Sequence, residues 1–512
     1  MKIALPCIVM ILLSFLFWGQ ANAHAEDLPS DITELPIEEL MKIEVVHGAS
    51  KFEQKVTEAP SSVSIITADD IKKHGYRTLA DILQSARGFY ISYDRHYKYV
   101  GVRGFARPGD YNTRVLILVD GHRINDNIYG QGYIGTDLIL DIDLIDRVEL
   151  IRGPSSSLYG SNAFFGVINI ITKNGKAING LEISGEAGSF SAYKGRASVG
   201  KRFENGLGLL LSGTIYNSEG QQLYFSEFNG TTKNDDDSYK SVFSAASFYG
   251  FTLQAAYSER EKGIPTGAWD TVFDDPATRT IDKSGYVHLS YNRDTNYVDI
   301  MARLYYDYNR YDGIYRLRDP NVLNKDISRG EWWGGELRFT VSKIRRNRLI
   351  LGMEYLNNIL QEQINYYEDP YSLKLEDRRN SQEYALYAQD EITILNNLLL
   401  NIGVRYDHYD TFGGATNPRI ALIYNPLKET TVKLLYGSAF RAPTVYELYY
   451  HDGWNTQKPA QSLRPETITT YELTIEEYIK KNTLIIASAY YYKIKDLITL
   501  DTDTDGLMVY KN

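Results

Sequence analysis

Residues 147–172 read RVELIRGPSSSLYGSNAFFGVINIIT. Val148–Ile151 and Val167–Ile171 are apolar, β-prone runs, and each predicts a strand. Between them, Gly153-Pro154 predicts a turn, and the small residues after it favour a helical turn. The order is therefore strand, turn, helical turn, strand.

A second block, RVLILVDGHRIND, precedes the first at residues 114–126. In this order the two blocks resemble the plug domain of TonB-dependent outer-membrane receptors. The resemblance implies a transmembrane antiparallel β-barrel of about 22 strands, with an N-terminal α+β plug domain inside its lumen. It also implies a place in the Gram-negative cell outer membrane.

The first 23 residues are typical of a signal peptide. Lys2 gives a positive start, Ile3–Trp18 is mainly apolar, and Ala21-Asn-Ala23 is a small-residue cleavage site. A membrane-spanning helix is the weaker interpretation, because the apolar run is short. Cys7 would be removed with this segment, which excludes disulfides and thiolate metal sites in the mature chain.

Composition agrees with a membrane barrel. The chain has 42 Tyr, a mean hydropathy of only −0.34, and no stretch beyond the signal long enough for an apolar helix. A soluble β-sandwich or propeller would also fit these values. The net charge of −10 argues against nucleic acid as a partner. We expect a monomer in contact with outer-membrane lipid.

The patterning divides the rest of the chain into three parts. Residues 24–50 are a polar lead-in on the periplasmic side, residues 51–175 are the plug, and residues 180–512 are the barrel. Within the plug, Thr67 and Thr78 each precede an aspartate by three residues, which predicts two capped helices. Further plug strands are expected at Val63–Ile66, Tyr99–Val102 and Val115–Val119.

Period-2 alternation marks the barrel strands. Along Leu400–His408, apolar and aromatic residues alternate with Asn401, Gly403, Arg405 and Asp407, which predicts a polar inner face. About sixteen candidate strands follow residue 180. A barrel this small would hold the plug poorly, so we expect the chain to lack roughly the last six strands.

The links between strands differ with parity. Links after even-numbered strands are short, whereas most links after odd-numbered strands are long and polar, as expected for periplasmic turns and external loops. The predicted long links are 218–237, 261–281, 311–328, 363–379 and 441–465.

Ile43, Glu44, Val45 and Val46 resemble a TonB box, the segment that such receptors present to the periplasmic protein TonB. A short β-prone segment can join a partner's sheet edge through main-chain hydrogen bonds. The alternative is an edge strand of the plug.

The resemblance also implies ion pairs between the plug and the barrel. The predicted plug arginines are Arg103, Arg147 and Arg152, and the predicted carboxylates on inward barrel faces are Glu354, Glu383 and Glu472. A buried guanidinium needs such partners.

The loop from Phe440 to Glu466 resembles the FRAP…NPNL region of these receptors, although its second half is degenerate. Arg441, Tyr449 and Trp454 are candidate contacts for an anionic chelate. His451 lies where haem receptors carry an iron ligand, and His96 or His122 would be the second ligand from the plug. A solvated loop histidine is the simpler interpretation.

Asp501, Asp503 and Asp505 match the first half of a calcium-binding loop, but the terminal Glu is absent and a solvated turn is favoured. Asn234–Ser238 is a weaker calcium candidate. No cofactor is required, and no catalytic motif is present in the sequence, so we do not expect an enzyme.

Together these features predict a receptor for active uptake of a scarce ligand. A ferric siderophore is the first cargo expected, followed by cobalamin and haem. A plain channel and a surface adhesin are the alternative classes, and neither needs a TonB-contacting segment.

Overall fold

A five-stranded sheet forms the centre of the plug. The computed structural model describes residues 45–512 except 107–108, 461 and 480–482. The strand order is β3-β8-β9-β6-β7, with β6 and β9 parallel and the other pairs antiparallel. The bounds are β3 (Ser62–Thr67), β6 (Val115–Val119), β7 (His122–Arg123), β8 (Ile145–Arg152) and β9 (Gly166–Thr172).

Two capped helices form in the plug, as predicted, and the first of them contacts β3 and β8. In α3 (Ala68–His74) the Thr67 hydroxyl accepts from the Asp70 N–H while the Asp70 carboxylate accepts from the Thr67 N–H. Thr78 and Asp81 repeat this capping box for α4 (Leu79–Ser85). Among the described residues no helix is long and apolar enough to cross a membrane.

The remaining plug elements are short. β4 (Phe89–Tyr93) and β5 (Lys98–Val102) form a separate hairpin, and β1 pairs with β2. The helical turn predicted after Gly153-Pro154 is α5 (Ser156–Tyr159), which contacts strands of the barrel wall. The other bounds are β1 (Val45–Val46), β2 (Gln54–Lys55), η2 (Val56–Glu58), η3 (Ile142–Leu144) and α6 (Gly175–Ile178).

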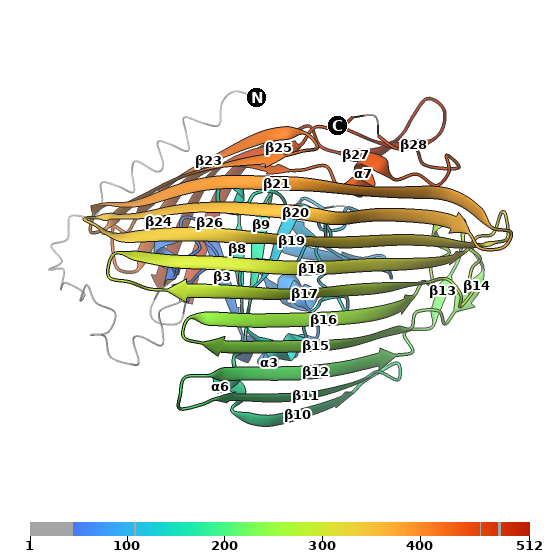
Figure 1. The fold of residues 1–512 in the computed structure, drawn as a ribbon, viewed down its shortest axis with the longest axis horizontal. Helices are drawn as coiled ribbons and strands as arrows, with labels where there is room; N and C mark the ends of the chain where they lie inside the picture. Colours follow the sequence, from blue (N-terminus) through green and yellow to red (C-terminus); the bar gives the residue numbers. More distant parts are fainter. Residues whose placement is uncertain (1–44, 107–108, 461, 480–482) are drawn as a thin grey trace. The chain divides into compact units, whose positions relative to one another are not determined.

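One antiparallel sheet of 15 strands makes up the barrel wall, with β10 and β26 at the ends of the strand order (Figure 1). Its strands follow one another along the chain and pair with their sequence neighbours, apart from two inserted hairpin strands. The bounds are β10 (Gly180–Ala187), β11 (Tyr193–Arg202), β12 (Gly208–Ser218), β15 (Asp237–Phe248), β16 (Phe251–Gly263), β17 (Arg279–Arg293), β18 (Val298–Arg316), β19 (Leu323–Ile344), β20 (Asn347–Tyr367), β21 (Ser372–Leu395), β22 (Leu398–Tyr409), β23 (Gly413–Tyr424), β24 (Thr430–Arg441), β25 (Glu466–Ile479) and β26 (Thr483–Lys495).

The described sheet has one strand fewer than the sixteen expected. The final segment instead folds as a hairpin of β27 (Thr499–Thr502) and β28 (Met508–Lys511) beside the loop that follows β24. Tyr510 packs there against Leu463 and Ile498. A second hairpin, β13 (Leu223–Phe225) with β14 (Gly230–Thr232), lies in the link after β12. The remaining short helices are η4 (Ala268–Asp270) and α7 (Val445–Tyr449).

The wall is polar inside and apolar outside, as the period-2 pattern predicted. In β22, Asn401, Arg405 and Asp407 are buried, whereas Ile402 and Val404 are exposed. Such an arrangement places apolar side chains toward lipid.

The parity of the links is only partly as predicted. With the strands of the wall counted from β10 as the first, the links after the second, fourth and later even-numbered strands are short, and the links 218–237, 263–279 and 441–466, which follow the third, fifth and thirteenth strands, are long. The predicted loops 311–328 and 363–379 are wrong: β18 to β21 continue through most of both ranges, leaving links of 316–323 and 367–372. Asn324, Ser328, Gln363 and Asn365 in these ranges are buried, and the wall rises further than the period-2 pattern indicates.

Candidate functional site

The described chain begins with a short hairpin on the plug. In β1, Val45 pairs with Lys55 and Val46 with Gln54. Val46 is fully buried within the plug core. The described half of the predicted TonB box therefore has the edge-strand arrangement named as the alternative, and Ile43 and Glu44 lie outside the described residues.

Glu149 of β8 holds the loop that follows β1. Its carboxylate accepts hydrogen bonds from the Gly48 N–H at 2.8 Å, the His47 N–H at 3.2 Å and the Asn169 amide at 3.0 Å. Arg147 lies beside it, with Nη2 2.9 Å from Oε1. Glu149 is completely buried, so it needs these partners. Sequence reasoning missed it, although one carboxylate in an apolar strand was the available signal.

Lys51, at the end of this loop, reaches into the barrel wall. Its Nζ lies 2.7 Å from Glu336 Oε1 and 2.8 Å from Glu354 Oε1. These two glutamates are directly opposite each other on β19 and β20. Like charges so placed repel each other, and the ammonium between them offsets that repulsion. Sequence analysis predicted Glu354 as a plug partner but assigned it to an arginine.

A chain of charges continues from Lys51 along the wall. Arg405 Nη2 lies 2.7 Å from Glu354 Oε2, and Arg405 Nε lies 2.8 Å from Asp407 Oδ1. Arg405 also donates to the Leu158 carbonyl of the plug at 2.9 Å. We call Glu336, Lys51, Glu354, Arg405 and Asp407 the charge chain.

Two cavities lie at the ends of the charge chain. The outer cavity, of about 140 Å³, is lined by Glu354, Arg405 and Asp407 together with Pro443 of the external loop after β24. The inner cavity, of about 400 Å³, is lined by Lys51 and Glu336 with residues near the short periplasmic turns. The charge chain therefore lies between the outer cavity and the inner cavity, beside the plug.

Of the predicted pairs between plug arginines and barrel glutamates, one is present in the described residues. Arg103 Nη2 lies 2.6 Å from Glu472 Oε1 and Nη1 lies 2.8 Å from Oε2. Arg147 pairs within the plug with Asp146 and Glu149 instead. Arg152 donates to the Arg87 carbonyl and the Ser64 hydroxyl. Glu383 lines the outer cavity and has no ion pair among the described residues.

Arg441 is a structural residue, which corrects its prediction as a ligand contact. It is completely buried, and it binds Glu447 of α7 and Glu466 of β25 with two hydrogen bonds each, all 2.9 Å. Arg114 of the plug binds the same Glu466 carboxylate at 2.6 and 2.9 Å. The cluster joins the external helix, the wall and the plug.

Replacing Arg441 with Met is expected to destabilise the fold by about 3–5 kcal/mol, because Glu447 then lacks its buried cation. Thermal unfolding in detergent would measure the loss. Arg464→Met is the matched control: this side chain is 74% exposed and pairs with Asp496 at 2.6 Å, so its loss should be nearly neutral. Equal melting temperatures for the two variants would contradict the structural role of Arg441.

The other loop candidates lie at the external mouth. The Arg379 guanidinium stacks over the Tyr449 ring, 3.4 Å from its centroid. Trp454 is 56% exposed, and the His451 Nδ1 accepts a hydrogen bond from the Gly453 N–H at 3.2 Å. Arg379 thus takes the place that sequence reasoning gave to Arg441.

The two plug histidines are buried and partnered. His96 Nε2 lies 2.9 Å from the Thr280 hydroxyl, and His122 Nε2 lies 2.8 Å from Asp307 Oδ1. Burial, with nearby arginines, holds the pKa of both imidazoles well below the usual range. Both are therefore neutral and occupied in this conformation, and neither Nε2 is free for an iron ion.

Asp503 and Asp505 both contact Lys458, whose Nζ lies 2.7 and 2.6 Å from their carboxylates. Asp503 also pairs with Lys511 at 3.1 Å. Asp501 lies in β27, opposite Val509. Calcium at these aspartates stays a prediction.

Comparison with known proteins identifies the family to which this plug and barrel wall belong. The family profile "TonB-dependent Receptor Plug Domain" matches residues 55–167, and "TonB dependent receptor-like, beta-barrel" matches residues 215–512. The vitamin B12 transporter BtuB of Vibrio vulnificus is 26% identical over 484 residues, covering 91% of this chain and 71% of the relative. The iron-regulated outer membrane virulence protein of Vibrio cholerae is 24% identical, covering 89% and 69%.

Solved structures show the same fold. The ferric enterobactin receptor PfeA of Pseudomonas aeruginosa, in a mutant form in complex with enterobactin, superposes with a TM-score of 0.69 at 19% identity, covering 88% of this chain and 76% of that one. The ferric yersiniabactin uptake receptor FyuA of Yersinia pestis gives 0.67 at 17% identity, covering 86% and 73%. Plug, wall and family matches agree: this chain belongs to the TonB-dependent receptors of the Gram-negative outer membrane.

Proposed function

We propose that the protein captures a scarce ligand at its external mouth and transports it inward when TonB engages residues 43–46. The observation that carries the proposal is the path from that segment to the charge chain. Val46 is five residues from Lys51, and Lys51 is the plug residue that bridges Glu336 and Glu354. Tension on the segment would draw Lys51 from between the two carboxylates.

Withdrawal of Lys51 changes the space beside the plug. Glu336 and Glu354 would then repel each other and require water, since a buried unpaired charge is costly. Hydration of this point would connect the inner and outer cavities. The wall residue Arg405 would stay on Glu354 and Asp407, so the opening would be local to the plug segment.

The cargo that we propose is a ferric siderophore. Arg379, Tyr449 and Trp454 present a guanidinium and aromatic faces at the mouth, and these suit an anionic chelate with aromatic groups. Cobalamin is the second candidate, because relatives that align with 90% of the chain's length, at 27% identity, are vitamin B12 transporters. Haem is third, since both plug histidines are engaged.

A binding and uptake assay tests the proposal. We expect a ferric siderophore to quench the tryptophan fluorescence of the purified protein, and radiolabelled iron to accumulate only in cells that have TonB. Cells without TonB should bind the chelate at their surface and not import it. Binding of cobalamin and not of a siderophore would make cobalamin the cargo. Import by cells without TonB would contradict active transport by this protein.

A further inference from the structure

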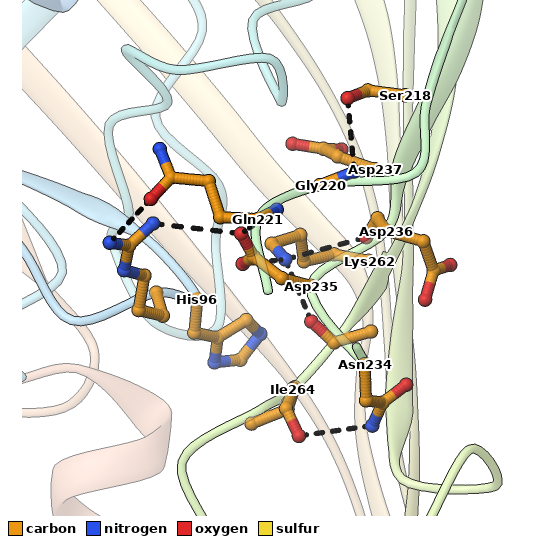
Figure 2. A network of polar contacts seen from close by, with 12 residues as sticks. His96, Ser218, Gly220, Gln221, Asn234, Asp235, Asp236, Asp237, Lys262 and Ile264 are labelled. Atoms are coloured by element: carbon orange, nitrogen blue, oxygen red, sulfur yellow. Dashed lines mark hydrogen bonds and ion pairs between the residues drawn. The ribbon is translucent and has the colours of Figure 1, made fainter. Parts of the chain in front are cut away.

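At the external rim of the wall, buried cations are matched by carboxylates. Lys262 Nζ lies 2.9 Å from Asp235 Oδ1, and Arg95 of the plug lies 3.5 Å from the other oxygen of that carboxylate (Figure 2). Arg260 Nε lies 3.0 Å from Asp237 Oδ1 on the neighbouring strand. Such pairing is what a buried charge requires. The inner cavity has a different arrangement.

The inner cavity carries an excess of positive charge. Its described lining contains four cationic side chains and two carboxylates, namely Lys51, Lys173, Arg303, Arg338, Asp120 and Glu336. The lining of the outer cavity has the opposite balance, with two arginines and five carboxylates. The two cavities therefore differ in the sign of charge that they favour.

Both carboxylates of the inner cavity are already engaged. Glu336 Oε1 lies 2.7 Å from Lys51 Nζ. The Asp120 carboxylate accepts hydrogen bonds from the Thr172 N–H at 3.0 Å, the Thr172 hydroxyl at 2.7 Å and the Gln254 amide at 2.7 Å. Lys51 thus balances Glu336, and neutral donors hold Asp120. The other three cations have no ion pair among the described residues.

Two of these three cations bind only main-chain oxygens. The two Nη atoms of Arg303 donate to the plug carbonyls of Gly121 and Asp120. The Arg303 Nε is buried and has no hydrogen-bond acceptor in the part of the chain that the structure describes. Lys173 Nζ donates to the Asp143 carbonyl at 2.7 Å. Their positive charges are therefore solvated by dipoles and not neutralised.

Arg338, the third cation, lines the cavity with neither a hydrogen bond nor an ion pair to any described residue. On β19 it lies two residues from Glu336, which is directly opposite Arg303 of β18. Long side chains in this diagonal arrangement are within reach of each other. His288 of β17 lines the same cavity, is 2% exposed, and has a buried Nδ1 without a described partner. Several unused donors therefore face one space.

We propose that the inner cavity binds a multivalent oxyanion, a polycarboxylate or a phosphate, between Arg303 and Arg338. Guanidinium groups match the planar geometry of carboxylates and phosphates. A positively charged cleft with walls of low polarity also concentrates anions. The volume of about 400 Å³ is in the range of small-molecule sites. Because the lining lies near the periplasmic turns, the anion enters from the periplasm. This inference is independent of the cargo and of TonB.

A single thiol measures the electrostatic potential of the cavity in the purified full-length receptor. Cys7, the only cysteine of the chain, lies in the predicted signal peptide, and Asn292→Cys places a thiol at an exposed position of the lining. We compare an anionic with a cationic methanethiosulfonate reagent, each relative to its rate with a free thiol. The anionic reagent should be favoured about tenfold. Adding Arg338→Met should reduce this preference. Adding Lys240→Met, which removes a 62% exposed lysine, should not.

Citrate and inorganic phosphate are the probes for binding. At constant ionic strength, we expect at least one of them to protect Asn292→Cys from modification and to raise the melting temperature of the native protein. Protection by citrate alone would identify a carboxylate ligand, and protection by phosphate alone a phosphate ligand. Arg338→Met should weaken the protection about tenfold, because a charge-assisted hydrogen bond is lost.

The melting temperature of Arg338→Met without any anion separates binding from a structural role. It should equal that of the native protein, because Arg338 has no described partner to lose. A clearly lower value would make Arg338 a structural residue and contradict the proposal. A preference for the cationic reagent would overturn it as well, and so would folded native protein that neither anion protects.

Discussion

A proline at Val45 is expected to reduce cargo uptake to the level of a strain without TonB, while the dissociation constant of the cargo stays unchanged. Strand addition depends on main-chain hydrogen bonds, and proline removes a donor and fixes φ. The external mouth is far along the chain from this segment, and the strand partner of β1 is β2 of the plug. Binding by purified protein and import by whole cells would be measured on the same variant.

Val45→Thr is the matched control, because threonine is β-branched, similar in volume, and keeps the backbone N–H. Val46 is less suitable for this comparison, since its side chain is fully buried in the plug and any change there also perturbs the core. Val45→Thr should import cargo normally. Normal import by Val45→Pro would rule out residues 43–46 as the segment that TonB engages.

Replacing Lys51 with Met is expected to loosen the plug and let ions pass without TonB. The two opposed carboxylates lose their shared cation, at a cost of about 3 kcal/mol, the lower end for a broken buried pair. We take the lower end because the Glu354 side chain is 26% exposed. The expected results are a lower melting temperature and a higher conductance in planar bilayers.

Two further variants isolate the charge effect. Lys51→Arg keeps the cation and should retain low conductance. Adding Glu336→Gln to Lys51→Met removes the repulsion and should restore much of the stability, because Arg405 still compensates Glu354. If the double variant is as unstable as Lys51→Met alone, repulsion between the glutamates is not the cause, and the charge chain is not the barrier.

Features with a local signal were predictable from the sequence. The capping boxes at Thr67 and Thr78 lie within four residues of chain, and period-2 alternation gave the polar inner face of β22. The plug itself followed from two ordered blocks. Among the arginines and glutamates named for such ion pairs, Arg103 and Glu472 are the two that the described structure brings together.

Partners separated along the chain were not predictable in the same way. Lys51 and Glu336 are 285 positions apart. No local pattern indicates that a lysine, rather than one of the three arginines predicted for this role, pairs with the barrel glutamates. Arg441 was predicted to be a ligand contact in the loop. Its two glutamate partners lie on either side of a degenerate motif, so the sequence did not show that they bind it. The loops at 311–328 and 363–379 were misread because their polar residues line the inside of tall strands.

The long strands β18 to β21 determine the kind of surface that the protein exposes on the external side. Strands β18 to β21 contain 19, 22, 21 and 24 residues. About 9–11 residues cross the hydrocarbon layer, so much of each strand stands above it. At about 3.3 Å per residue the longest is about 80 Å. On this side an antibody or a phage fibre meets a hydrogen-bonded surface of fixed shape, and an antibody raised against a linear peptide from residues 311–328 has only the short link 316–323 as chain outside the strands to recognise.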